Sequence, residues 1–404
     1  MTHSPVRTEA GPAADGESET GQTAGQTAEQ TAGQATTAPA VPDVPDVTDG
    51  PDVPDGTDGP APGTFRARRA TVVLLLAAAA LVLALIASLS IGRFNVPFNE
   101  VARMLIGQVL DIRQTWTAQE EQVVLGSRLP RVLLAMIVGG GLALAGATLQ
   151  AVFRNPLVSP QVIGVSSGAS FGGVLALMLG LGTTWLIGLS FAMGALAIWI
   201  VIGIGRTRTG GSVLMIVLGG VVVSALFSAL VSLVTTLADP YTTLPSIVFW
   251  LMGSLTAASM QKVAVALVPV AVGTAVILLL RWRINVLSLG DVEARSLGLR
   301  PQPLRVLLLA MVALMTAGAV AVSGVIGWVG LVVPHIARLI VGPDHRVLMP
   351  LSVLIGAGYL ALIDTLSRSV STTELPVGIL TAVIGAPVFI WLLRTNRRGS
   401  TIED

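Results

Sequence analysis

Long apolar runs separated by short polar segments make up most of the chain from Thr71 onward. Each run is close to the roughly 20 residues that a helix needs to cross a bilayer. Several contain Gly or Pro, which membrane helices tolerate when neighbouring helices satisfy the freed backbone groups. The pattern predicts an all-α, polytopic membrane protein with about ten transmembrane helices. The expected spans are 71–91, 131–151, 160–181, 184–205, 212–237, 260–281, 304–323, 324–341, 347–368 and 377–394.

The composition agrees with a membrane protein. Hydrophobic residues make up 53% of the chain and charged residues only 12%, whereas soluble domains are about one-quarter charged. Cysteine is absent, which excludes disulfides and thiolate metal sites. The three histidines, His3, His335 and His345, are too scattered to suggest a zinc site. The sequence therefore predicts no metal site.

The first 65 residues differ from the rest. They contain the low-complexity stretches GQTAGQTAEQTAGQ and VPDVPDVTDGPDVPDGTDGP, and they carry eleven acids against the single base Arg7. Such a segment has too little apolar surface to offset the entropy lost on ordering. The regular aspartates could suggest a metal-binding repeat, but interleaved Pro and Gly favour a solvated acidic tail. We therefore expect a disordered acidic tail at 1–65 and the ten-helix transmembrane domain at 66–398.

The basic residues predict the orientation of the spans. If the N-terminus is inside, the interior segments hold sixteen bases and the outer segments seven, five of them in the first outer loop and the adjoining Arg131. Outside that stretch, only Lys262 and Arg368 are outer bases. The positive-inside rule then places both termini in the cytoplasm of a multi-pass protein of the cell membrane.

The chain lacks an energy source of its own. It has no GxxxxGK[ST] phosphate-binding loop, and its only lysine, Lys262, follows Gln261. Carboxylates near the spans are few, and Asp364 lies one helical turn before Arg368, which favours an ion pair over a proton relay. No polar block resembles the selectivity ring of a channel. We predict a transport subunit that is not itself an enzyme, with an ion-coupled secondary transporter as the alternative.

An interior loop at 282–304 is the expected contact with a partner. Gly290 and Gly298 bracket a short helix in this loop, as helix-ending glycines do. Leu287, Leu289 and Val292 are among its apolar residues. A short amphipathic helix of this kind can dock into a groove on another protein. The alternative is a helix that lies on the membrane interface.

Five segments resemble the FecCD-type permeases, the membrane subunits of type II ABC importers for iron-siderophore, haem or cobalamin. They fall in the same order as in that family, between about residues 70 and 395. The segments are RLPR at 128–131, GGGLALAGATLQAVFRNPLVSPQVIGVSSGASFG at 139–172, LGDVEARSLGL at 289–299, GWVGLVVPHIARLIVGPDHRVLMP at 327–350 and ELPVGILTAVIGAPVFIWLL at 374–393.

The resemblance implies the partners. A FecCD-type permease pairs with a second copy or a paralogue, binds two ATPase subunits that carry ATP and Mg, and receives cargo from an extracytoplasmic binding protein. No cofactor in this chain and no nucleic acid is implied. The commonest cargo of the family is a ferric siderophore, with haem or cobalamin as alternatives. The family's coupling helix matches Gly290, Asp291, Glu293, Ala294, Arg295, Leu297 and Gly298.

The resemblance also implies residues for docking and gating. Arg128, Arg131 and Arg368 occupy positions where family members present arginines to glutamates of the binding protein, and we expect Arg128 and Arg368 to lie outside the core. For Arg131 the residues alone also allow a snorkelling side chain. The PHI motif occurs in the family whatever the substrate, so His335 is interpreted as structural. The implied cytoplasmic gate comprises Asn155, Pro156 and Leu157, and Ser212, Val213 and Leu214.

Overall fold

The computed structural model of the chain describes residues 62–205, 213–370 and 373–399. Within these ranges every regular element is a helix, which confirms the predicted all-α class. All but the last few residues of the expected acidic tail lie outside the described residues. The helices are α1 Pro62–Ser90, α2 Phe98–Gly107, α3 Ala118–Glu121, the π-helical segment Gln122–Arg128, α4 Leu129–Phe153, α5 Val165–Met178, α6 Thr183–Gly205, α7 Val213–Leu237, α8 Thr243–Leu251, α9 Met260–Leu279, α10 Arg281–Leu289, α11 Asp291–Ser296, α12 Pro301–Ser323, α13 Val329–Val341, α14 His345–Ser369 and α15 Val377–Gly399.

Ten of the described helical stretches are apolar and match the ten expected spans. Seven are long and apolar enough to cross a membrane, and the three shorter ones are Val165–Met178, Val329–Val341 and Val377–Leu392. The apolar pattern thus predicted the number and order of the helices within the described residues. It overestimated the length of two of them.

The spans expected at 160–181 and 324–341 both begin as non-helical backbone. Helices α5 and α13 start only after residues with positive φ, Gly164 at 86° and Trp328 at 68°. The two irregular segments pack together, because a Cβ added to Gly327 would lie 2.5 Å from Nε2 of Gln161. Irregular backbone at membrane depth requires protein neighbours that exclude lipid. The two segments cover each other in part, and α7 adds to the cover, since a Cβ on Gly220 would lie 2.8 Å from the carbonyl oxygen of Val162.

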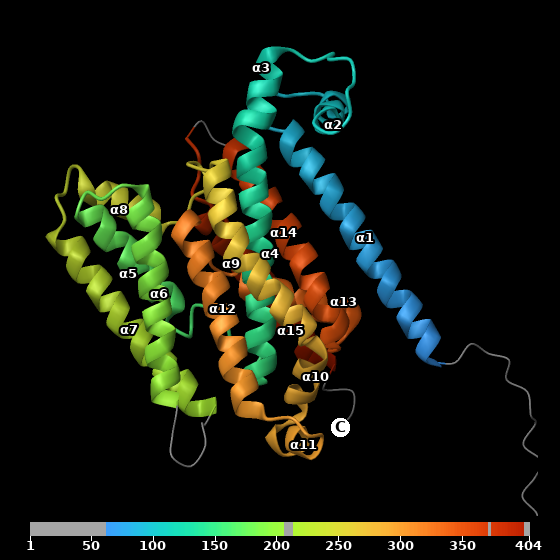
Figure 1. The fold of residues 1–404 in the computed structure, drawn as a ribbon, viewed down its shortest axis with the longest axis vertical. Helices are drawn as coiled ribbons and strands as arrows, with labels where there is room; N and C mark the ends of the chain where they lie inside the picture. The colour runs from blue at the N-terminus through green and yellow to red at the C-terminus, as the bar shows by residue number, and fades with distance from the viewer. Residues whose placement is uncertain (1–61, 206–212, 371–372, 400–404) are drawn as a thin grey trace, which may run out of the picture. The chain divides into compact units, whose positions relative to one another are not determined.

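Helix α4 occupies the centre of the bundle and packs against α9, α12, α13 and α14 (Figure 1). Every residue from Val138 to Phe153 is buried. One close crossing is with α14, where a Cβ on Gly139 would overlap the carbonyl oxygen of Gly356. Small residues at such a crossing let two backbones approach closely, which is how membrane helices gain packing energy.

Helices at the periphery expose the apolar surface that a lipid bilayer covers. On α1, Leu75 and Leu76 are each 65% exposed, and on α7 Leu233 is 55% exposed. Exposed apolar patches of this extent are rare on soluble monomers. Figure 1 places the N-terminal end of α1 and helix α11 at one end of the bundle, with α2 and α3 at the other.

Candidate functional site

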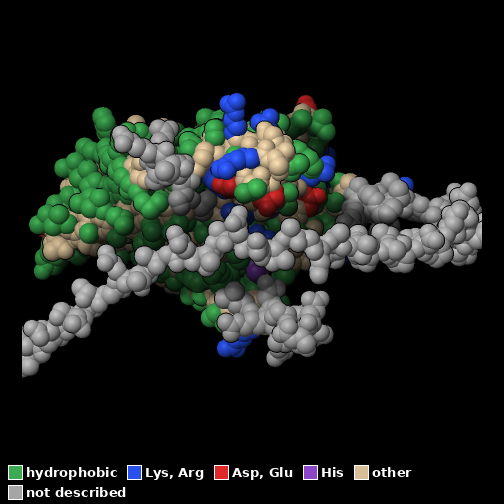
Figure 2. Space-filling model, turned by 90° about the horizontal axis from the view of Figure 1, so that it is seen from below, with side chains coloured by type: hydrophobic (Ala, Val, Ile, Leu, Met, Phe, Trp, Pro, Cys, Tyr) green, Lys and Arg blue, Asp and Glu red, His purple; other side chains and the backbone are tan. Residues whose placement is uncertain are grey.

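The end of the bundle that carries α11 is rich in charge. Figure 2, viewed from this end, shows Lys and Arg side chains gathered there with several acidic ones. Helix α11 runs from Asp291 to Ser296, after Gly290 with φ 148° and before Gly298 with φ 80°. Positive φ favours glycine because it lacks a Cβ. The expected short helix between two glycines is confirmed, whereas its coupling role stays a prediction.

A buried arginine fastens α11 to the bundle. Arg305 of α12 has a fully buried side chain and donates from Nη1 to Oδ2 of Asp291 at 2.8 Å, while its Nη2 donates to Oδ1. The hydrogen bonds from Arg305 lower the pKa of Asp291 below its usual value. Bidentate arginine–carboxylate pairs fix orientation as well as distance. Helix α11 is therefore held in a defined orientation.

The outward side of α11 is mixed apolar and charged. Val292 is 73% exposed and Leu297 62% exposed, and Glu293 and Arg295 are exposed as well. Two expected contact residues are buried: Leu287 is 1% exposed because it packs into the core of the bundle from α10, and Ala294 of α11 is 0% exposed. The surface available to a partner therefore comprises α11 with Leu289 before it and Leu297 after it.

The structure brings the first expected gate segment next to α11. Arg154 ends α4 in a left-handed conformation, with φ 51°, and a Cβ on Gly290 would lie 3.5 Å from its Nη1. Asn155, Pro156 and Leu157 follow and are exposed. Of the second gate segment, Ser212 lies outside the described residues, Val213 begins α7, and Leu214 is 63% exposed.

At the opposite end, two arginines cap α1. Arg128 donates from Nη1 to the carbonyls of Leu89 at 2.6 Å and Ser90 at 3.0 Å, and Arg368 donates to that of Ile91 at 2.9 Å. The last carbonyls of a helix have no partner within the helix, and the helix dipole is negative there. The two guanidiniums donate hydrogen bonds to these carbonyls, and their positive charge is favourable at the negative end of the helix dipole.

The third arginine joins two carboxylates. Arg131 donates from Nε to Asp364 Oδ1 at 2.7 Å and from Nη1 to Glu374 Oε2 at 2.7 Å. Asp364 is fully buried, and its Oδ2 lies 3.5 Å from Nε of Arg368. The expected pair of Asp364 and Arg368 is confirmed. Its extension to Arg131 and Glu374 was missed, because more than 200 residues separate the partners and no sequence spacing signals the contact.

The electrostatics of this cluster differ at its two acids. Partial burial acts to raise the pKa of Glu374, but hydrogen bonds from Arg131 and Thr256 outweigh it and lower the pKa. The side chain of Asp364 has no exposed surface, so its negative charge is compensated by the guanidiniums of Arg131 and Arg368 and not by water. With three arginines and two acids, the cluster has a formal charge of +1. We call these five residues the arginine cluster.

The expectation that Arg128 and Arg368 lie outside the core is wrong. Their residues are 6% and 7% exposed, and Arg131 is 7% exposed. The carbonyls at the end of α1 and the buried Asp364 draw the guanidiniums inward. The structure does bring all three arginines together, at the end of the bundle opposite α11. Their docking role stays a prediction.

His335 lies in the interior of the bundle. It is 5% exposed, and its ring meets that of Phe389 edge-on at a centroid distance of 6.2 Å. No group of three His, Asp or Glu side chains that could hold a metal ion occurs among residues 62–205, 213–370 and 373–399. The aromatic contact gives His335 a packing role in α13.

The long apolar helices around a buried centre are those of an integral membrane protein. The family model described as "FecCD transport family" matches residues 80–395. The chain therefore belongs to the FecCD transport family and is a permease of the ABC importer type.

Relatives of known name cover most of the chain. It is 42% identical to the molybdate import system permease protein MolB of Haemophilus influenzae, over 80% of this chain and 95% of that protein. It is 43% identical to a probable iron chelatin transport system permease protein of Helicobacter pylori, over 68% of this chain and 83% of that protein. A solved metal-chelate type ABC transporter in an inward-facing conformation is 41% identical, with a TM-score of 0.70 over 80% of this chain and 99% of that one.

Proposed function

We propose that this chain forms, with a second copy or a paralogue, the pathway through which a ferric siderophore enters the cell. The observation that carries the proposal is the family match over residues 80–395, together with 43% identity to a permease named for iron chelatin. Haem and cobalamin are alternative cargoes, as relatives named for each are 38% and 42% identical. A separate pair of ATPase subunits, which bind ATP and Mg, supplies the energy.

A second candidate cargo is molybdate. The relative named for molybdate import aligns with 95% of its own length, against 83% for the iron chelatin relative. The decisive experiment is uptake into vesicles that hold the assembled importer with its own binding protein. Radioactive iron as a ferric siderophore should accumulate with ATP, and excess haem, cobalamin or molybdate should not compete. Accumulation of radioactive molybdate in its place would reassign the cargo.

We propose that α11 transmits the energy by docking into a groove of the ATPase. Three features support this: the exposed Val292 and Leu297 can enter an apolar groove, Glu293 and Arg295 can fix register, and Asp291 anchors the helix to Arg305. Arg154, which comes directly before the expected gate segment, lies close to Gly290 at the start of α11. A shift of α11 would therefore act directly beside that segment.

We propose that the arginine cluster supports docking of the binding protein. Its formal charge of +1 attracts an acidic partner, and the pair of Arg131 with Glu374 ties the loop before α15 to α4. The test is the association rate of the binding protein with assembled importer carrying Arg368→Gln, after its folding has been verified. We expect slower association at low salt and convergence with wild type at high salt, because salt screens long-range steering. Equal rates at low salt would contradict the docking role.

We propose that α11 and both termini face the cytoplasm. The absence of cysteine makes this directly testable, because any introduced cysteine is the only thiol. Ser296→Cys on α11 and Tyr241→Cys, whose wild-type side chain is 89% exposed in the turn before α8, are suitable probes. In intact cells, a membrane-impermeant thiol reagent should label the position-241 variant and not the position-296 variant. Reversed labelling would invert the orientation.

A further inference from the structure

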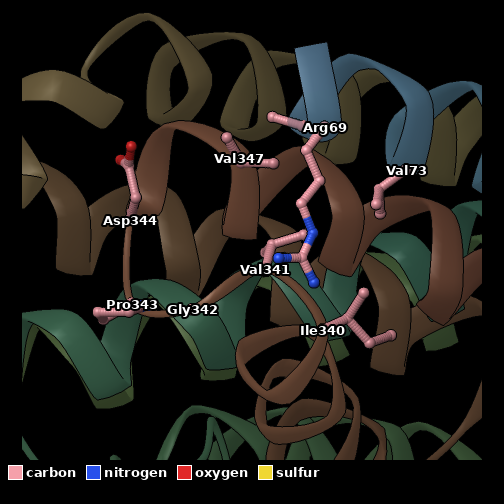
Figure 3. Close-up of a pocket in the computed structure, with 9 residues that line it drawn as sticks. Arg69, Val73, Ile340, Val341, Gly342, Pro343, Asp344 and Val347 are labelled. Carbon is pink, nitrogen blue, oxygen red and sulfur yellow. The ribbon is translucent and has the colours of Figure 1, made fainter. Parts of the chain in front are cut away.

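A cavity opens beside α1 at the end of the bundle that carries α11. Its volume is about 510 Å³, and its walls come from the start of α1 and from the turn between α13 and α14. Figure 3 shows Val73 on α1, with Ile340 and Val347 on the other elements, as apolar parts of the wall. Arg69 and Asp344 supply the charges. The transport proposal assigns nothing to this place.

The two charged groups lie on different sides of the cavity. Arg69 reaches from α1 toward Val341 and Gly342, whereas Asp344 stands beyond Pro343 (Figure 3). The guanidinium of Arg69 makes no hydrogen bond or ion pair with any residue that the structure describes. Arg69 is exposed, so all the N–H donors of its guanidinium are available to a phosphate oxygen.

The carboxylate of Asp344 is only partly used by the protein. Its Oδ1 accepts from Nδ2 of Asn285 at 2.6 Å and from the backbone N–H of Arg346 at 2.9 Å. No described donor occupies Oδ2. This oxygen is available to an ammonium group. The cavity therefore offers one anion-binding and one cation-binding group, separated by apolar wall.

The position of the cavity matches the headgroup level of a membrane. Arg69 lies one turn before the lipid-exposed stretch of α1, where Val72 is 53% exposed and Leu76 is 65% exposed. Arginine-rich ends of membrane helices lie at the headgroup region, with the apolar residues in the acyl-chain region. A molecule that fills the cavity therefore has a charged head at Arg69 and an apolar portion along α1.

We propose that this cavity binds a phospholipid whose headgroup carries a primary ammonium, of which phosphatidylethanolamine is the simplest. The phosphate pairs with Arg69, the ammonium donates to Oδ2 of Asp344, and an acyl chain follows Val73 toward the exposed face of α1. Phosphatidylglycerol offers no cation to Asp344. The trimethylammonium of phosphatidylcholine has no N–H to donate. Charge complementarity together with the need for an N–H donor thus selects the ethanolamine headgroup.

The test is native mass spectrometry of the purified full-length chain, delipidated in detergent and offered equal amounts of phosphatidylethanolamine, phosphatidylglycerol and phosphatidylcholine. Wild type should retain phosphatidylethanolamine in preference to both others. Arg69→Gln should lower this retention by about tenfold, because it removes a charge-assisted hydrogen bond. Arg68→Gln is the matched control, since Arg68 is an exposed neighbour outside the cavity wall, and it should bind as wild type does.

A second variant tests the ammonium contact separately. Asp344→Asn keeps an oxygen for capping α14, for which asparagine serves as well as aspartate, and removes the charge. It should abolish the preference for phosphatidylethanolamine over phosphatidylglycerol. If Arg68→Gln and Arg69→Gln lowered the retention of phosphatidylethanolamine equally, the proposal would be overturned, because the lipid would then be attracted by the general surface charge and not by this cavity. A wild-type preference for phosphatidylglycerol, or no preference, would also overturn it.

Discussion

Replacing Asp364 by asparagine tests whether the buried ion pairs of the arginine cluster stabilise the fold. The carboxylate is fully buried and lies between Arg131, at 2.7 Å from Nε, and Arg368, at 3.5 Å from Nε. Asparagine has the same shape and keeps one acceptor oxygen, so the change removes charge with little change in volume. Two guanidiniums then remain buried, and Glu374 is the one acid among the described residues that still pairs with either of them.

The expected loss is large for one substitution. Unit charges about 4 Å apart attract by about 4 kcal/mol at an effective dielectric constant of about 20. Removing one partner of a buried ion pair costs about 3–5 kcal/mol, because the other charge stays uncompensated. We therefore expect Asp364→Asn to lower the free energy of unfolding by about 3 kcal/mol. Glu374→Gln is the control, and about 1 kcal/mol is expected there, since the side chain of Glu374 is 32% exposed.

The assay is unfolding of the purified chain by sodium dodecyl sulfate in mixed micelles, followed by tryptophan fluorescence. A double variant, Arg131→Met with Asp364→Leu, should recover part of the loss, because apolar residues of similar size replace buried ion pairs well. An Asp364→Asn variant as stable as Glu374→Gln would refute the claim that the buried ion pairs of Asp364 stabilise the fold. Normal stability with abolished transport would instead support a proton relay and an ion-coupled transporter.

Three other perturbations follow from the structure. Gly139→Val should lower the free energy of unfolding by about 1–3 kcal/mol or more in the same assay, because the valine side chain would overlap a backbone carbonyl of α14. An unchanged midpoint of detergent unfolding would contradict the close approach of α4 and α14. The charge-reversed pair Glu293→Lys and Arg295→Glu should leave insertion intact and reduce ATP-driven uptake by the assembled importer at least tenfold; full uptake would place coupling elsewhere. Asp291→Asn should cost about 1 kcal/mol at pH 7, since its folded-state pKa is lowered, and the stabilisation is lost as pH falls below the unfolded value of about 4. If the difference in unfolding free energy between wild type and Asp291→Asn grew as the pH fell, the predicted pH dependence would be wrong.

The sequence by itself determined the architecture within the described residues. Apolar runs of about 20 residues specify membrane helices because the bilayer imposes a minimum length and leaves no water for the backbone. Gly290 and Gly298 located α11 for a similarly local reason, since positive φ ends a helix at glycine. These features depend on neighbours in the chain, so one sequence suffices to predict them.

Only the tertiary structure decided which distant residues meet. The late starts of α5 and α13 leave two irregular segments that pack against each other, and no local pattern reports this contact. Arg131 and Asp364 lie 233 positions apart, and their contact turns an expected surface charge into a buried ion pair. The cavity beside α1 likewise combines a residue near the start of the bundle with a turn more than 270 residues later. Such contacts depend on how helices cross, which packing throughout the bundle sets.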